Sequence, residues 1–225
     1  MARRRTYGSY NDGCAAAHAL DLIGERWAMI VVRELLLGPK RFSTIQRDVI
    51  GVSPAVLTQR LQGLEASGIV QRHQIPTPGT GEAYELTPWG YQLEPVNTAL
   101  SMWAIQSPAF PWQADMSPDA LILAMRAHAR PIAPDTAACT VVLHLSDSRL
   151  PSTDTVDYVA HCTSMKTTIE RRATTGIDVD AAVRSSTQSW KALILGGRDL
   201  DDTLGTSILG SAAAVSTLLR VSRLK

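Results

Sequence analysis

A proline-rich segment, 108-PAFPWQADMSP-118, separates two halves of the chain whose apolar residues repeat with different periods. Before it, apolar residues recur at helical steps of three and four positions. After it, they alternate along short runs, as in strands with one buried face. A chain of 225 residues has room for one large domain or two smaller ones. We therefore expect a domain at residues 1–107, a linker at 108–118 and a second domain at 119–225.

The composition is that of an ordinary globular protein, with 45% hydrophobic and 19% charged residues. The formal net charge is +1, so a surface that binds nucleic acid would have to be a local cluster. No apolar run is long enough to span a membrane. Because the three cysteines are an odd number in a chain too large to need disulfides, we expect a reduced, cytoplasmic protein.

Helical periodicity and turn signals predict a mainly helical first domain with one hairpin. Within 25-ERWAMIVVRELLLG-38, apolar residues share one helical face: Trp27, Ile30, Val31, Leu35 and Leu36. Ser43 is a candidate cap for the next helix, and Pro95 predicts a kink or a late start in the last one. The expected helices lie within 14–23, 25–38, 41–49, 53–67 and 88–105, and the strands at 69–75 and 83–87 flank 76-PTPGTG-81.

The segment 53-SPAVLTQRLQGLEASGIV-70 carries clear helix signals. Ser53 is a cap, Pro54 suits the first helical position and Gly68 ends the helix. One face holds the apolar anchors Leu57, Leu61 and Leu64. The opposite face is small or polar without charge, and it consists of Ala55, Gln59 and Gln62 with Val56 and Thr58 at its edges.

Such a face is typical of a helix that enters a DNA groove. Glutamine can bond adenine edges in pairs, and threonine or valine can touch a thymine methyl group. Taken alone, the helix is equally consistent with a solvated surface. The short helix before it and the hairpin after it favour a winged helix-turn-helix, in which this helix reads bases.

Phosphate contacts would come from local cations and donors, which supply affinity but no sequence information. Arg60 points sideways and is open to two interpretations, a phosphate contact or an ion pair with Glu65 or another acid. The remaining candidates are Lys40, Arg41, Arg47, Arg72, Ser43, Ser53, His73, Thr77, Thr80 and the Arg3–Arg5 arm.

The segments 14-CAAAHALDLIGERWAMIVVRELLLGPKRFSTIQRDVIGVSPAVLTQRLQGLEASGIVQR-72 and 84-YELTPWGYQLEPV-96 closely resemble the HxlR-type winged helix-turn-helix transcriptional regulators. The resemblance implies a homodimer that binds a near-palindromic double-stranded operator. It also implies that the helices at 14–23 and 88–105 form the dimer interface. The family's wing often carries an arginine, whereas 75-IPTPGTGEA-83 has no basic residue.

The second half predicts an α+β domain in which helices cover a sheet of about five strands. Period-2 alternation marks strands at 139–145, 156–162, 165–172 and 177–183, and a short strand is expected at 206–209. Helices are expected at 118–129, 187–195, 200–204 and 211–221. The overall fold class is therefore multidomain, a mainly α winged helix-turn-helix domain followed by an α+β domain.

The tail 178-DVDAAVRSSTQSWKALILGGRDLDDTLGTSILGSAAAVSTLLRV-221 resembles the sterol-carrier-protein type 2 fold. That resemblance implies a tunnel for an apolar small molecule, and the alternative for each lining residue is plain core packing. The candidate lining is Trp190, Leu193, Ile194, Leu204, Ile208, Leu218 and Leu219.

No set of acid, base and nucleophile is apparent, and no metal or cofactor is expected, so the chain is not predicted to be an enzyme. Cys14 begins a helix, where a thiol pKa falls. The resemblance to the HxlR-type regulators implies a redox or electrophile sensor at this position, and the alternative is a small packed residue. We expect a transcriptional repressor whose operator affinity responds to an apolar small molecule. The alternatives are a thiol switch at Cys14 and a lipid carrier or enzyme with a vestigial DNA-binding domain.

Overall fold

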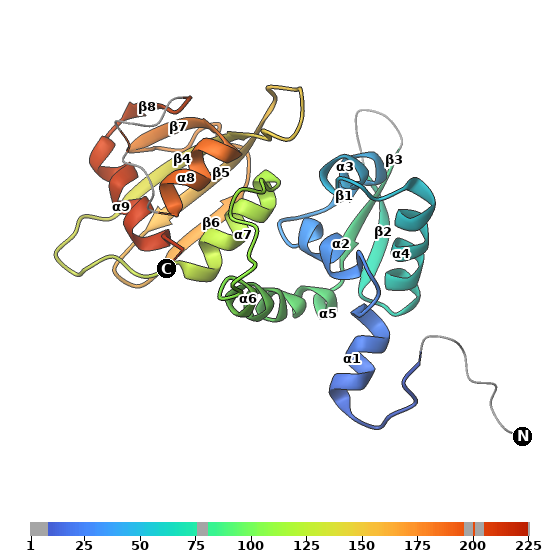
Figure 1. The fold of residues 1–225 in the computed structure, drawn as a ribbon. Coiled ribbons are helices and arrows are strands. Elements are labelled where there is room, and N and C mark those ends of the chain that lie inside the picture. The colour runs from blue at the N-terminus through green and yellow to red at the C-terminus, as the bar shows by residue number, and fades with distance from the viewer. Residues whose placement is uncertain (1–8, 76–80, 196–199, 201–204, 225) are drawn as a thin grey trace, which may run out of the picture. The chain divides into compact units, whose positions relative to one another are not determined.

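The computed structural model describes residues 9–75, 81–195, 200 and 205–224, and the chain divides into two compact units, Met1–Asn97 and Thr98–Lys225 (Figure 1). The segment expected to be a linker is bonded to the second unit, because the Lys191 ammonium donates to the carbonyl oxygens of Trp112 and Ala114. The exact limits of the domains stay a prediction. None of the described helices is long and apolar enough to cross a membrane.

The first unit contains the expected helices and hairpin. The interruption predicted near Pro95 falls at Gln92, between two helices, and the last helix crosses the boundary between the units. The turn at 76–80 lies outside the described residues. The elements are α1 (Ala15–Ile23), α2 (Ala28–Leu35), β1 (Lys40–Arg41), α3 (Phe42–Asp48), α4 (Pro54–Ala66), β2 (Val70–Ile75), β3 (Gly81–Leu86), α5 (Pro88–Tyr91) and α6 (Leu93–Ala104).

Helices α2, α3 and α4 pack around a small antiparallel sheet of order β1-β3-β2. Helix α4 lies along the hairpin and contacts both α2 and β2 (Figure 1). The core between them is made of fully buried aliphatic side chains, including Val31, Leu35, Ile45, Leu57 and Leu61. Burial of this apolar stripe fixes which side of α4 faces outward.

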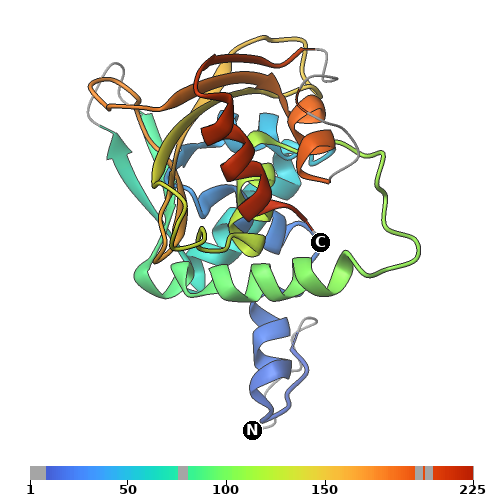
Figure 2. The ribbon, with the colours of Figure 1, turned by 90° about the vertical axis from the view of Figure 1, so that its left-hand side faces the viewer.

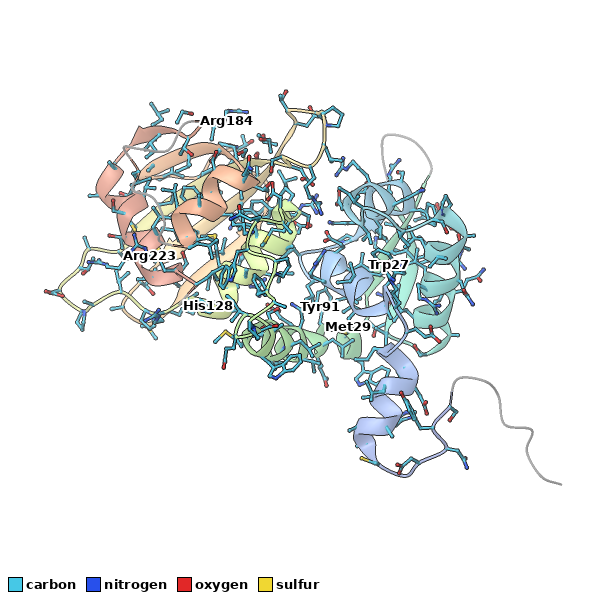
Figure 3. The ribbon with its side chains drawn as sticks, in the orientation of Figure 1. Trp27, Met29, Tyr91, His128, Arg184 and Arg223 are labelled. Atoms are coloured by element: carbon cyan, nitrogen blue, oxygen red, sulfur yellow. The ribbon has the colours of Figure 1, made fainter. Side chains whose placement is uncertain are left out.

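Two local predictions in this unit were wrong. Trp27, labelled in Figure 3, does not belong to α2 but directly precedes it. Its backbone is left-handed, with φ of 78°. Ser43 is not a cap, because the chain stays extended through Arg41, which pairs with Ala83 of β3, and α3 begins at Phe42. Ser43 is instead an exposed residue of the first turn of α3.

The second unit is a five-stranded sheet of order β6-β5-β4-β7-β8, with α7, α8 and α9 on one face (Figure 2). Strands β4 and β7 run parallel, and the other neighbours are antiparallel. The α+β prediction is confirmed at this level. Of the short helix expected at 200–204, residues 201–204 lie outside the described residues. The elements are α7 (Pro118–His128), β4 (Cys139–Ser146), β5 (Thr155–Cys162), β6 (Thr167–Arg171), β7 (Ala181–Ser186), α8 (Thr187–Ile194), β8 (Ser207–Gly210) and α9 (Ala212–Ser222).

Two strand starts differ from the prediction. Met165 does not join β6 but lies in the turn before it, which is closed by hydrogen bonds between Thr163 and Lys166. Strand β7 begins at Ala181, so Ile177 precedes the strand. In both places the alternation of residue types extends into irregular backbone before the strand, which the pattern could not reveal.

Candidate nucleic-acid interface

Helix α4 turns small and uncharged polar side chains outward. Its start is set by Ser53, whose Oγ accepts a hydrogen bond from the Val56 N–H at 3.3 Å, and by Pro54 at the first helical position. The inner face is anchored by three buried leucines, Leu57, Leu61 and Leu64. Val56 is partly buried at the edge of the outward face, and the exposed predicted residues are Ala55, Thr58, Gln59 and Gln62.

Both charged residues of α4 are held in ion pairs at its flanks. Arg60 lies 3.1 Å from Glu25, which decides between its two interpretations in favour of an ion pair, and the partner is not Glu65. Glu65 instead accepts a hydrogen bond from Arg72 at 2.9 Å. The outward face therefore offers hydrogen-bonding groups and methyl groups without a net charge, which suits contacts to adenine edges and thymine methyl groups.

Arg72 does not have the free charge that a phosphate contact needs. The hydrogen bond to Glu65 raises the pKa of the Arg72 guanidinium. A second carboxylate oxygen, Glu82 Oε2, lies 3.4 Å from Arg72 Nη1. Two carboxylates thus compensate the one cation. The structure does not favour Arg72 as a phosphate contact, and the charge pattern of the sequence alone did not show this pairing.

Lys40 was predicted to contact phosphate, but it is buried. Its ammonium lies 2.8 Å from Glu34 Oε2 and 2.8 Å from Asp48 Oδ2, and its side chain is only 2% exposed. Burial would raise the pKa of Glu34, but the cations of Lys40 and Arg33 lower it to about 2. Lys40 therefore links α2 to α3 by buried ion pairs and is not at the surface where DNA would bind.

The remaining candidates lie nearer the surface. Arg47 is half-exposed and bonds Asp48 at 2.9 Å, and Arg41 is partly buried beside β3. His73 on β2 lies 3.4 Å from Glu85. Ser43 and Ser53 are exposed at the first turns of α3 and α4. Thr77, Thr80 and the Arg3–Arg5 arm lie outside the described residues.

Helix α3, helix α4 and the hairpin β2–β3 follow one another in the chain. We compared this arrangement with known proteins. Residues 22–108 match the HxlR-like helix-turn-helix family. The HTH-type transcriptional regulator YvaP of Bacillus subtilis (strain 168) is 38% identical over 88 residues, which are 39% of this chain and 82% of YvaP. The chain belongs to the HxlR-like family. It is accordingly a helix-turn-helix regulator of transcription that binds DNA.

The chain is also similar to YodB, both as a sequence and as a solved structure. The HTH-type transcriptional regulator YodB of Bacillus subtilis (strain 168) is 35% identical over 88 residues, covering 39% of this chain and 79% of YodB. The solved reduced form of YodB covers 43% of this chain and 95% of its own, with 33% identity and a TM-score of 0.39. The family match ends at residue 108, so it does not extend to the five-stranded sheet of the second unit.

Helices α1 and α6 of this HxlR-like chain are apolar, yet none of their residues, all of which the structure describes, is buried. Leu20, Leu100 and Trp103 are exposed, and the Trp103 side chain is exposed to 76%. Between α1 and the start of α6 lies a groove of about 230 Å³. Its apolar lining includes Ala19, Leu22, Ile23, Trp89, Leu93 and Val96.

Cys14 lies directly before α1 and is exposed. Hydrogen bonds from the backbone N–H groups of Ala17 and Ala16 lower the pKa of its thiol. The sequence predicted a lowered thiol pKa at this helix start, and the pKa of Cys14 is lowered. An exposed thiol of lowered pKa is a more reactive nucleophile than a buried one.

The predicted lining of the second unit is closely packed. Trp190 is fully buried, and its Nε1–H points to the sulfur of Met125 at 3.3 Å. Ile208 on β8 is partly exposed, and Leu204 lies outside the described residues. The others are at most 5% exposed: Leu193, Ile194, Leu218 and Leu219. The role of these residues in holding a ligand stays a prediction.

Proposed function

We propose that the chain acts as a homodimer that binds a near-palindromic DNA operator, with α4 in the major groove and the hairpin β2–β3 as a wing. The uncharged outward face of α4 carries this proposal, since its charged residues are withdrawn into ion pairs while Gln59 and Gln62 stay exposed. Glutamine amides suit paired bonds to adenine. Arg41, Arg47, Ser43, Ser53 and His73 supply contacts to the phosphate backbone.

Gln59 tests base reading. We expect Gln59→Ala to weaken binding to a selected operator by about 1–3 kcal/mol and to leave binding to shuffled DNA nearly unchanged. The operator is first selected from a pool of randomised duplexes, and affinity is measured by fluorescence anisotropy at fixed salt. Gln188→Ala, at an exposed glutamine of α8, is the matched control. An equal loss on selected and shuffled DNA would remove Gln59 from the base-reading face.

The proposed dimer would explain why α1 and α6 are apolar although none of their residues is buried in the single chain. A second copy would cover the α1 groove and the exposed side of α6, and two-fold symmetry would place the two α4 helices for a palindrome. We expect Leu100→Glu to produce monomers in sedimentation velocity and to lower operator affinity. Met165→Glu, at an exposed methionine of the second unit, should leave the dimer intact.

Repression and its control by an apolar small molecule in the second unit are also proposed. Support comes from the order of a strand, a tryptophan-bearing helix, a short strand and a final apolar helix at the end of the chain. A ligand changes operator affinity only if it binds the two states of the dimer unequally. Native mass spectrometry of the purified protein tests this, because a bound apolar molecule would add mass to the dimer.

A second candidate function is a thiol switch at Cys14, favoured by the exposure and lowered pKa of this thiol. In that case Cys14→Ser removes the response of operator affinity to electrophiles, and the second unit is structural. The rate of alkylation of Cys14 should be the fastest of the three cysteines at neutral pH. A Cys14→Ser variant that keeps the full response would exclude this candidate.

A further inference from the structure

Cys139 and Cys162 face each other across the sheet of the second unit. Cys139 is the first residue of β4, Cys162 is the last of β5, and the register pairs them directly. Directly paired residues of antiparallel strands point to the same face, with Cα atoms about 4.5–5.5 Å apart. Disulfides join Cα atoms about 4.4–6.8 Å apart. The backbone therefore already holds the two residues at a separation that a disulfide can bridge.

The two thiols lie close enough for each to affect the pKa of the other. Cys139 Sγ lies 3.9 Å from the carbonyl oxygen of Ala214 in α9. The pair thus lies on the helix-covered face at the ends of β4 and β5. Cys162 is fully buried, whereas Cys139 is partly exposed and follows the exposed residues Ala137 and Ala138. An oxidant from solvent would meet Cys139 first.

We propose that Cys139 and Cys162 are a dithiol that hydrogen peroxide converts reversibly into an intrachain disulfide. The Cys139 thiolate attacks one peroxide oxygen, the O–O bond breaks, and a sulfenic acid and water form. The Cys162 sulfur then attacks the Cys139 sulfur, and the hydroxyl group leaves as a second water. Two thiols lose two electrons and two protons in total, and the peroxide accepts both. An added thiol reductant restores the pair.

This site is separate from Cys14 in place and in reactivity. It lies in the second unit, beyond the part of the chain that matches the HxlR-like family. Burial raises the pKa of the Cys139 thiol and raises that of Cys162 to about 12, whereas backbone N–H groups lower the pKa of Cys14. The pair therefore oxidises after Cys14, under stronger or longer exposure to peroxide.

The test uses the full-length Cys14→Ser variant treated with hydrogen peroxide, then denatured and alkylated with N-ethylmaleimide. The expected product is a monomeric chain that has lost the mass of two hydrogen atoms, takes no label, and gives one cross-linked peptide pair joining Cys139 to Cys162. Reduction before alkylation should restore two labels. Wild-type protein, in which Cys14 is oxidised, confirms that the peroxide is active.

Single variants in the same background separate a dithiol from two independent cysteines. In Cys162→Ser, Cys139 has no resolving partner and should gain one or more oxygen atoms. In Cys139→Ser, Cys162 should stay reduced and alkylatable after denaturation. The proposal is overturned if both thiols stay alkylatable when Cys14 of the wild type is oxidised. It is also overturned if Cys139 gains oxygen with Cys162 present, or if the disulfide forms between chains.

Discussion

The buried cluster of Glu34, Lys40 and Asp48 allows a quantitative prediction for Lys40→Met. Methionine keeps a long apolar side chain but removes the ammonium that lies 2.8 Å from each carboxylate. The side chains of the two acids are only 0% and 8% exposed, so water cannot replace the lost cation. Removing one partner of a buried ion pair costs about 3–5 kcal/mol. We expect a loss in this range for the free energy of unfolding of the first unit.

The pH dependence of this loss has a definite sign. The pKa of Glu34 is lowered from 4.5 to about 2 in the folded chain, which corresponds to about 3 kcal/mol of stabilisation. Because a lowered carboxyl pKa stabilises the folded state above the unfolded pKa, this contribution is complete above pH 4.5 and disappears as the pH falls toward 2. The difference between wild type and Lys40→Met should therefore shrink below pH 4.5.

The assay must report on the first unit alone, since a chain with two units need not unfold in one step. Pulsed hydrogen exchange at increasing urea, read on peptides from α2, gives that information. Lys166→Met, at an exposed lysine of the second unit, is the control. A loss below about 1 kcal/mol together with a weaker salt dependence of DNA binding would refute the buried role. Lys40 would then be a surface cation that contacts phosphate.

Two further substitutions, one in each unit, test buried contacts. Tyr158→Phe removes the hydroxyl that donates to buried Asp119 at 2.5 Å, and we expect the second unit to lose about 1.5–3 kcal/mol in urea unfolding. The prediction fails if the urea midpoint of α7 peptides does not change. Gly90→Ala adds a Cβ that would overlap the carbonyl oxygen of Ile69, and we expect a cost of about 1–3 kcal/mol in the same assay on β2 peptides. An unchanged midpoint there would show that α5 moves away from β2 without cost.

Much of the fold followed from local signals in the sequence. Ser53, Pro54 and Gly68 mark the two ends of α4, and its leucine spacing gives the buried side, so the outward face could be derived without coordinates. The sheet of the second unit followed from period-2 alternation. Both signals depend on residues close together in the chain, so they can be recognised in a single sequence.

Other features depend on contacts between distant residues. Strand β1 has two residues and is too short for any periodicity, so its pairing with β3 was missed, and with it the start of α3 at Phe42. Lys40 follows a Gly-Pro turn and looks like a surface cation, but folding places it between Glu34 and Asp48. Which cations of a candidate site are already paired is a property of the tertiary structure. The outward face of α4 was therefore predictable, and its supply of free charges was not.

We propose that the outward face of α4 determines which DNA sequence this HxlR-like regulator binds. Selection from one randomised duplex pool, carried out in parallel with wild type and Gln59→Ala, tests this proposal most directly. We expect the preferred base to change or to be lost at the same position of both half-sites, while the spacing between half-sites stays the same. An identical consensus for the two proteins would contradict this expectation and place base recognition on another surface.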